Sequence, residues 1–244
     1  MNEQTETNIP KPKGEVILGL VDPRTLSPEA FKASGELLFH VTADRGFKYD
    51  WNHDYGVKLH PSAEYSSTIG NGFYTTDNRE VADIILVSRG SGAKLIELLP
   101  FNAKMFDMRS KEDERINELV DEEMFENFRV FVNEKYKKDK DSGNPKSIYQ
   151  ELAGYLNRHK FVTSKEKYIP LGLRTMLGRG NKTMSETYAN TFTEFIISQG
   201  YDGLIYIEGT DGDGTGKINC NSIVFFNPKV LGTYESWQQR KDEV

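Results

Sequence analysis

Short apolar runs near the two ends of the chain predict β-strands, and a long stretch with helical periodicity lies between them. Each run is rich in Val, Ile, Leu, Phe or Tyr and is bounded by Gly, Pro, Asn or Asp. Short helices are predicted where Ser27-Pro28 and Asp77-Asn78 place a capping side chain before apolar residues. The predicted strands are 15–20, 36–41, 72–76, 93–99, 203–208 and 222–226, with helices at 27–31 and 78–87 and a strand or short helix at 230–237.

The middle of the chain is predicted to be helical. Residues 110–139 carry apolar side chains every three or four positions, which is typical of an amphipathic helix. Strands at both ends with helices between them predict an α+β fold with a helical lobe inserted at about 109–199. We interpret the apolar stripe of this lobe as core, with a partner-binding groove as the alternative. Further helices are predicted over about 146–159, 166–178 and 183–199, the last ending at Gly200.

Length and composition limit the classes of function. The 244 residues fit one large domain at 15–244 after a polar tail at 1–14 that is predicted to be disordered. A net charge of −6 argues against general nucleic-acid binding, because lysine and arginine bind phosphate backbones. The single cysteine, Cys220, excludes a disulfide scaffold and favours a reducing compartment. No apolar run could span a bilayer and no secretory signal is recognisable, so we expect a cytoplasmic site of action.

The Gly/Asp-rich segment at 209–216 imitates two ligand-binding motifs but matches neither. Gly216-Lys217 would need a glycine where Asp211 stands and a serine or threonine where Ile218 stands to form a phosphate-binding loop. Read as a calcium loop that begins at Asp211, the segment has Ser222 where a bidentate glutamate is required. We therefore interpret 209–216 as the turn of a hairpin.

Other common sites are also not supported by the sequence. His53, His60 and Glu64 do not have the spacing of a helical zinc-binding face, and no cysteines join them, so no metal is predicted. There is no G-x-S-x-G motif, and Cys220 has no identifiable histidine partner, which argues against acyl transfer.

Three short segments, in order along the chain, together resemble a known family. FHVT at 39–42 resembles the His-Gly-Thr strand of the diphtheria-toxin-like and poly(ADP-ribose) polymerase-like ADP-ribosyltransferases. GNGFYTTD at 70–77 resembles the G-x-G-I-Y-F-A-D segment that follows in that family. The third segment is in two parts: GYDGL at 200–204, followed by SIVFFNP at 222–228, resembles the ending common in bacterial members. The three segments cover only a small part of the chain, and the helical block matches none of the family's motifs.

The resemblance implies a split β-sheet that holds NAD⁺ in a cleft between two small sheets. It implies that His40 hydrogen-bonds ribose hydroxyls, that the backbone of Val41 pairs with the nicotinamide carboxamide, and that Tyr74 stacks on the nicotinamide ring. An aromatic face suits a flat cationic ring, and a strand edge offers both a donor and an acceptor to a carboxamide. The cofactor-binding residues implied are His40, Val41, Thr42, Gly72, Phe73 and Tyr74.

Two departures from the family pattern bear on the activity. The family's catalytic glutamate aligns with Ser222, or with Asn221 if the strand slips by one residue, and neither is acidic. Stabilisation of developing positive charge would then have to come from another group. Polymerase members carry a second stacking aromatic where this chain has Ile84 and Ile85. The resemblance therefore implies a mono-ADP-ribosyltransferase, with His40, Tyr74, Ser222 and Asn221 as candidate catalytic residues.

Three alternatives remain open at the level of sequence. Tyr65-Ser66-Ser67-Thr68 faintly resembles the Ser-Thr-Ser strand of the arginine-Ser-Glu toxins, although that class has an arginine where this chain has His40. An NAD⁺ glycohydrolase would use water as the acceptor, and a non-catalytic interaction module would have no activity. By analogy with family members that are toxins or effectors, the expected partners are NAD⁺ and a host or other target protein, reached by secretion or injection without a cleaved signal.

Overall fold

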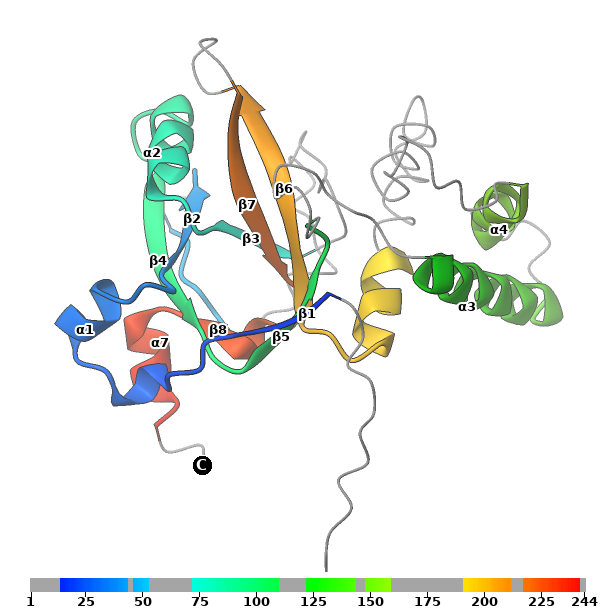
Figure 1. Ribbon diagram of the computed structural model, residues 1–244, viewed down its shortest axis with the longest axis horizontal. Coiled ribbons are helices and arrows are strands. Elements are labelled where there is room, and N and C mark those ends of the chain that lie inside the picture. The colour runs from blue at the N-terminus through cyan, green and yellow to red at the C-terminus, as the bar shows by residue number, and fades with distance from the viewer. Residues whose placement is uncertain are drawn as a thin grey trace, which may run out of the picture.

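The structure is a computed structural model that describes residues 14–43, 46–52, 72–109, 122–143, 148–158, 191–211 and 217–241. It confirms the α+β class: helices flank a curled eight-stranded sheet in the order β1-β5-β6-β7-β3-β2-β4-β8 (Figure 1). All paired strands are antiparallel except β5 and β6. The strands are β1 (Glu15–Leu18), β2 (Leu38–Thr42), β3 (Phe73–Thr76), β4 (Lys94–Pro100), β5 (Ala103–Asp107), β6 (Gly203–Asp211), β7 (Lys217–Phe225) and β8 (Leu231–Gly232).

Three of the described α-helices, α1, α2 and α7, begin at short polar side chains that cap them. Ser27 Oγ accepts a hydrogen bond from the Ala30 amide at 3.2 Å, and Asn78 Oδ1 accepts one from the Val81 amide at 3.2 Å. Of the two caps considered for the second helix, the structure uses Asn78. The helices are α1 (Pro28–Lys32), α2 (Arg79–Ser88), α3 (Glu122–Asp141), α4 (Ile148–Arg158), a helix over 191–198, and α7 (Tyr234–Gln239), with 3₁₀ turns η1 (Pro23–Thr25) and η2 (Pro228–Val230).

The structure corrects the sequence prediction at three places. β5 was not predicted; it follows β4 through a tight turn in which Asn102 has a φ of 48°. In the hairpin, β6 continues to Asp211 and β7 begins at Lys217, so both strands are longer than predicted and β6 extends into the predicted turn at 209–216. At the C-terminal end β8 and α7 both form, where one element was expected. The tail at 1–13 and the predicted helix at 166–178 lie outside the described residues.

In the described part of the helical lobe, the apolar stripe is core. It packs on the face of the sheet that carries Leu204 and Val224, and the cluster includes Phe128 and Val132 of α3. The opposite face carries a second cluster around Phe73, with members from β2, β4, β5, β6 and β7. Successive residues of a strand point to opposite faces, so β3 contributes to both clusters. No described helix is both long enough and apolar enough to cross a membrane.

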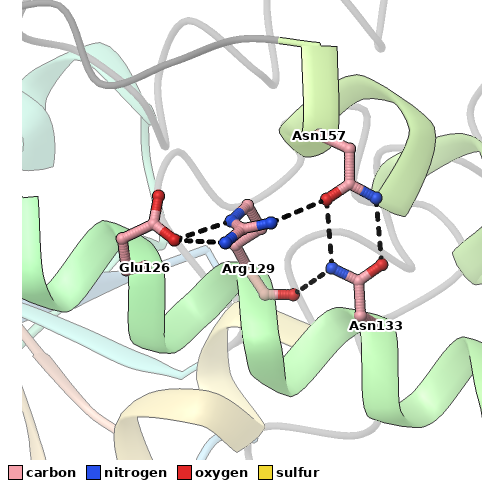
Figure 2. A network of polar contacts seen from close by, with 4 residues as sticks. All are labelled: Glu126, Arg129, Asn133 and Asn157. Atoms are coloured by element: carbon pink, nitrogen blue, oxygen red, sulfur yellow. Dashed lines mark hydrogen bonds and ion pairs between the residues drawn. The ribbon is translucent and has the colours of Figure 1, made fainter.

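A polar network on the surface joins α3 to α4 (Figure 2). The guanidinium of Arg129 is ion-paired with Glu126 and donates a hydrogen bond to Asn157 Oδ1 at 3.1 Å. Asn133 and Asn157 exchange two amide hydrogen bonds, at 3.2 and 3.0 Å. Because these groups are partly exposed to solvent, we interpret the network as fixing the alignment of the two helices more than their stability.

The C-terminal helix is held by a buried arginine. Arg240 is 4% exposed, and its guanidinium carbon lies 3.7 Å from the ring centroid of Trp237 and 4.7 Å from that of Trp51. It donates hydrogen bonds of 2.7 Å to the carbonyl oxygens of Lys229 and Leu231. A planar guanidinium suits such stacking between aromatic rings. Arg240 therefore ties α7 to η2, to β8 and to segment 46–52.

Candidate functional site

The three segments that carry the resemblance include three neighbouring strands, β7, β3 and β2. Thr76 of β3 pairs with Ser222 of β7 on one side and with Phe39 of β2 on the other. Among the described residues, Phe39↔Thr76 is the only pair that joins β2 to β3, so the two strands pair at a single position, directly next to His40.

The side chain of His40 bridges β2 and β3 next to their single pair. Its Nδ1 lies 2.8 Å from the main-chain oxygen of Tyr74. A carbonyl oxygen can only accept, so Nδ1 carries the proton and donates it, which leaves a lone pair on Nε2 of the neutral ring. No residue in the described part of the chain makes a hydrogen bond to Nε2.

Burial keeps His40 neutral. The imidazole contacts the ring of Phe73, with centroids 4.3 Å apart, and that of Phe47, at 5.6 Å, and these two phenyl rings lie 6.1 Å from each other. This burial lowers the pKa of His40 from 6.5 to about 4, against the opposing effect of the hydrogen bond to Tyr74, while the positive charge of Arg89 lowers it further. At neutral pH the ring is therefore a hydrogen-bond acceptor at Nε2 and not a cation.

We expect this lowered pKa to make folding pH-dependent. Because His40 binds a proton more readily in the unfolded chain, stability should fall as the pH drops from 6.5 toward about 4. Urea unfolding of the wild type and of His40→Asn at about pH 7 and about pH 5 measures the effect. The free energy of unfolding should fall more steeply in the wild type. Parallel losses in the two proteins would contradict the assignment.

His40 and Tyr74 meet through the main chain and not through their rings. The Tyr74 side chain packs against the cluster that contains Val224, its cross-strand partner, on the helical face of the sheet. The imidazole lies on the other face, against Phe73. Among the described residues, the aromatic ring closest to the candidate histidine is that of Phe73, which the resemblance implied as a cofactor-binding residue but not as the stacking one.

Val41, Thr42 and Gly72 occupy ordinary structural positions. Val41 is buried against Ala82 of α2, and Thr42 ends β2 opposite Lys94. At Gly72 a Cβ atom would lie 2.6 Å from a Val224 methyl and 2.8 Å from the carbonyl oxygen of Phe225. This contact is far too close for a methyl group, so the packing of β3 on β7 requires the glycine.

The positions that align with the family's glutamate lie on different faces of β7. Ser222 is 6% exposed and lies on the Tyr74 face, whereas Asn221 lies on the face that carries His40 and Phe73. Asn221 Nδ2 donates a hydrogen bond of 2.5 Å to Asp77 Oδ2, at the end of β3. Asp77 is thus a carboxylate beside the position where the acidic residue is missing.

Asp77 was not among the sequence candidates, although a signal was present. It occupies the last position of the GNGFYTTD segment, directly after β3. The register that pairs Thr76 with Ser222 brings Asp77 opposite Asn221, and sequence alone did not provide that register. Asp77 lies two residues beyond Thr75, which is level with His40 in the β2–β3 register, and that step is about 7 Å along a strand.

The described residues contain no group of three or more His, Cys, Asp and Glu side chains that could hold a metal ion. His53, His60 and Glu64 lie outside the described residues, as do Tyr65–Thr68 and the turn at 212–216. Ile84 and Ile85, which replace the polymerase aromatic, are half-buried on α2.

The C-terminal segment of the resemblance has a structural role. Asp202 accepts hydrogen bonds from the Lys104 amide at 2.9 Å and from Asn227 Nδ2 at 2.7 Å, so it joins β5, β6 and the end of β7. Comparison with known proteins adds no assignment, since no family model, curated protein or solved structure matches the chain significantly.

Proposed function

We propose that this protein is a mono-ADP-ribosyltransferase that uses NAD⁺ as donor and a protein side chain as acceptor. The observation that carries the proposal is the geometry at His40, where a neutral imidazole with a fixed tautomer bridges two strands next to the single pair that joins them. It is supported by the adjacency of β7, β3 and β2, the strands that contain the residues behind the resemblance.

The reaction needs little covalent chemistry from the protein. The glycosidic bond between ribose and nicotinamide breaks, and its electron pair leaves with nicotinamide as a neutral ring. A lone pair of the acceptor forms the new bond to the anomeric carbon, and the acceptor loses its proton. Catalysis therefore depends on positioning and on negative charge close to the developing ribosyl cation.

Residues of this chain can take both roles. Nε2 of His40 is an acceptor for a ribose hydroxyl, with its direction fixed by the Nδ1 hydrogen bond to Tyr74. We propose that Asp77, held by Asn221, supplies the negative charge that the family places on glutamate. Its carboxylate lies at the end of β3 that pairs with both β2 and β7.

Nicotinamide release from NAD⁺ by the purified protein tests the activity. If the chain is a transferase, the purified protein incubated with labelled NAD⁺ and a cell extract should transfer the label to a protein of the extract. Free ADP-ribose without labelled protein would instead identify the glycohydrolase. If neither labelled protein nor free ADP-ribose forms at high enzyme concentration, both activities are refuted.

Asp77→Asn is expected to lower nicotinamide release by about a hundredfold, because it removes the negative charge and keeps the size of the side chain. Asp83→Asn is the matched control: Asp83 lies on α2 in an exposed ion pair with Arg79, so its loss should leave turnover unchanged. Equal turnover in the two variants would show that Asp77 does not supply the negative charge that stabilises the ribosyl cation.

A second candidate function is a non-catalytic interaction module with this fold. It is favoured by Ser222 at the position of the catalytic glutamate and by the Tyr74 ring, which packs on the face opposite to His40. Calorimetry with NAD⁺ separates the candidates, because a module without a donor site should release no heat of binding.

A further inference from the structure

Exposed apolar side chains gather in one short segment, residues 17–21. Ile17 is 38% exposed, Leu20 75% and Val21 57%. The other large apolar residues that are exposed in the described part of the chain lie singly, on α2, on α3 and on the helix over 191–198. Single exposed apolar residues are common on proteins, whereas adjacent ones form a patch of the kind that contacts another molecule.

The most exposed part of this segment is anchored at both ends. The amide of Gly19 donates a hydrogen bond to Glu36 Oε1 at 3.1 Å, and its carbonyl oxygen accepts one from the Asn102 amide at 2.9 Å. On the other side, the carboxylate of Asp22 caps η1. Leu20 is therefore presented between two fixed points, so covering its side chain would cost little conformational entropy of the main chain.

A pocket with mainly apolar walls opens beside the segment. Its volume is about 190 Å³, and its apolar walls come from the segment itself, from α1 and its N-terminal side, and from the end of β4, at Val21, Leu26, Ala30, Leu99 and Pro100. Cavities of roughly 150 Å³ accommodate a molecule the size of benzene, so this pocket has room for one leucine side chain. Leu20, which precedes Val21, is not part of the wall.

We infer that the protein forms a two-fold symmetric dimer through this surface, in which Leu20 of each copy enters the pocket of the other. The exposed side chain and the pocket are neighbours, since Val21 belongs to the pocket wall. A two-fold axis that passes between them makes both contacts at once and closes the assembly at two copies. The inference does not depend on the proposed transferase activity.

The charges around this surface favour a second copy of the chain as the partner. A surface that meets its own copy is repelled when it carries charges of one sign. Here Asp22 is ion-paired with Arg24 at 2.8 Å, and Glu29 and Lys32 on α1 have opposite charges. The carboxylate of Glu36 in the pocket wall already accepts a main-chain hydrogen bond. The surface is therefore close to neutral, in a chain whose net charge is −6.

Sedimentation of the full chain at up to about 0.5 mM should show a monomer–dimer equilibrium. Leu20→Asn should weaken the dimer at least about tenfold, because it removes the inserted apolar side chain. Ala30→Leu should weaken it as much, because its side chain fills the pocket from within the same copy. The matched control Val87→Asn changes an apolar residue that is 80% exposed on α2, and its dimer should stay within about twofold of the wild type.

Mixing the two variants tests whether Leu20 and the pocket meet across copies. In a dimer of Leu20→Asn with Ala30→Leu, the remaining Leu20 faces the remaining open pocket, so one of the two contacts is restored. The mixture should associate more tightly than either variant alone and less tightly than the wild type.

Three results would overturn the inference. The wild type could stay monomeric at about 0.5 mM, in which case the surface is left for a different protein. Leu20→Asn could behave like Val87→Asn, or the mixture could be no tighter than its components. Oligomers that keep growing with concentration would also contradict it, because the contact would then be head-to-tail and not two-fold.

Discussion

Replacing His40 by Asn is expected to leave the protein folded and to reduce nicotinamide release by at least about a hundredfold. The amide nitrogen of the shorter side chain would occupy the place of Nδ1 and could still donate to the Tyr74 carbonyl oxygen, which accepts at 2.8 Å in the wild type. No group would remain at the place of Nε2. The variant thus keeps the hydrogen bond that joins β2 to β3 and removes only the atom proposed to bind ribose.

His40→Gln is the matched variant, since its longer side chain places an amide near Nε2 and should retain more activity than His40→Asn. Tyr74→Ala keeps the main-chain acceptor and removes only the ring, so it tests stacking separately from the bridge. Circular dichroism and urea unfolding establish that each variant is folded. Wild-type turnover in both His40→Asn and Tyr74→Ala would reject the proposed site.

Most helices and strands were predictable because their signals are local. Ser27 caps the helix that it was expected to cap, Asn78 is one of the two caps considered for the next helix, and β2 and β3 form within a residue or two of the predicted bounds. Capping and apolar runs act between residues a few positions apart, so a single sequence contains them in full.

β5 was missed because what stabilises it is distant in sequence. Lys104 donates its amide proton to the Asp202 side chain, and β5 pairs in parallel with β6, roughly a hundred residues later in the chain. The alternation of apolar and polar residues covers only Ala103 to Met105 before Phe106 breaks it, which is too brief to stand out after Pro100. Long-range pairing of this kind gives no local signal.

The arrangement of the candidate site depended on register, which the sequence did not provide. Pairing Phe39 with Thr76 puts His40 and Tyr74 on opposite faces of the sheet. A slip of one residue would have put both rings on the same face, as the resemblance implied. The same register brings Asp77 opposite Asn221, which is why a carboxylate next to the missing glutamate emerged only from the structure.

Gly203→Ala is expected to cost at least about 4 kcal/mol of stability or to prevent folding. A Cβ atom at this position would lie 2.0 Å from the carbonyl oxygen of Val224 and 2.6 Å from the Met105 side chain. β7 is held on its other side by β3, where Val224 pairs with Tyr74, and β6 is held by β5, where Gly203 pairs with Met105. The clash is with main chain, so no change of rotamer can relieve it.

Gly35→Ala is the control, since a Cβ atom there would have no neighbour within 4 Å and the change should stay within about 1 kcal/mol. Urea unfolding, or the soluble yield if Gly203→Ala does not fold, measures the difference. Comparable stability of the two variants would contradict the close approach of β6 and β7. If the cost is as large as expected, packing alone accounts for the second glycine of GYDGL. The resemblance at 200–204 would then reflect the packing of β6 on β7 and not NAD⁺ binding, and the proposal that NAD⁺ binds would rest on His40 and Asp77.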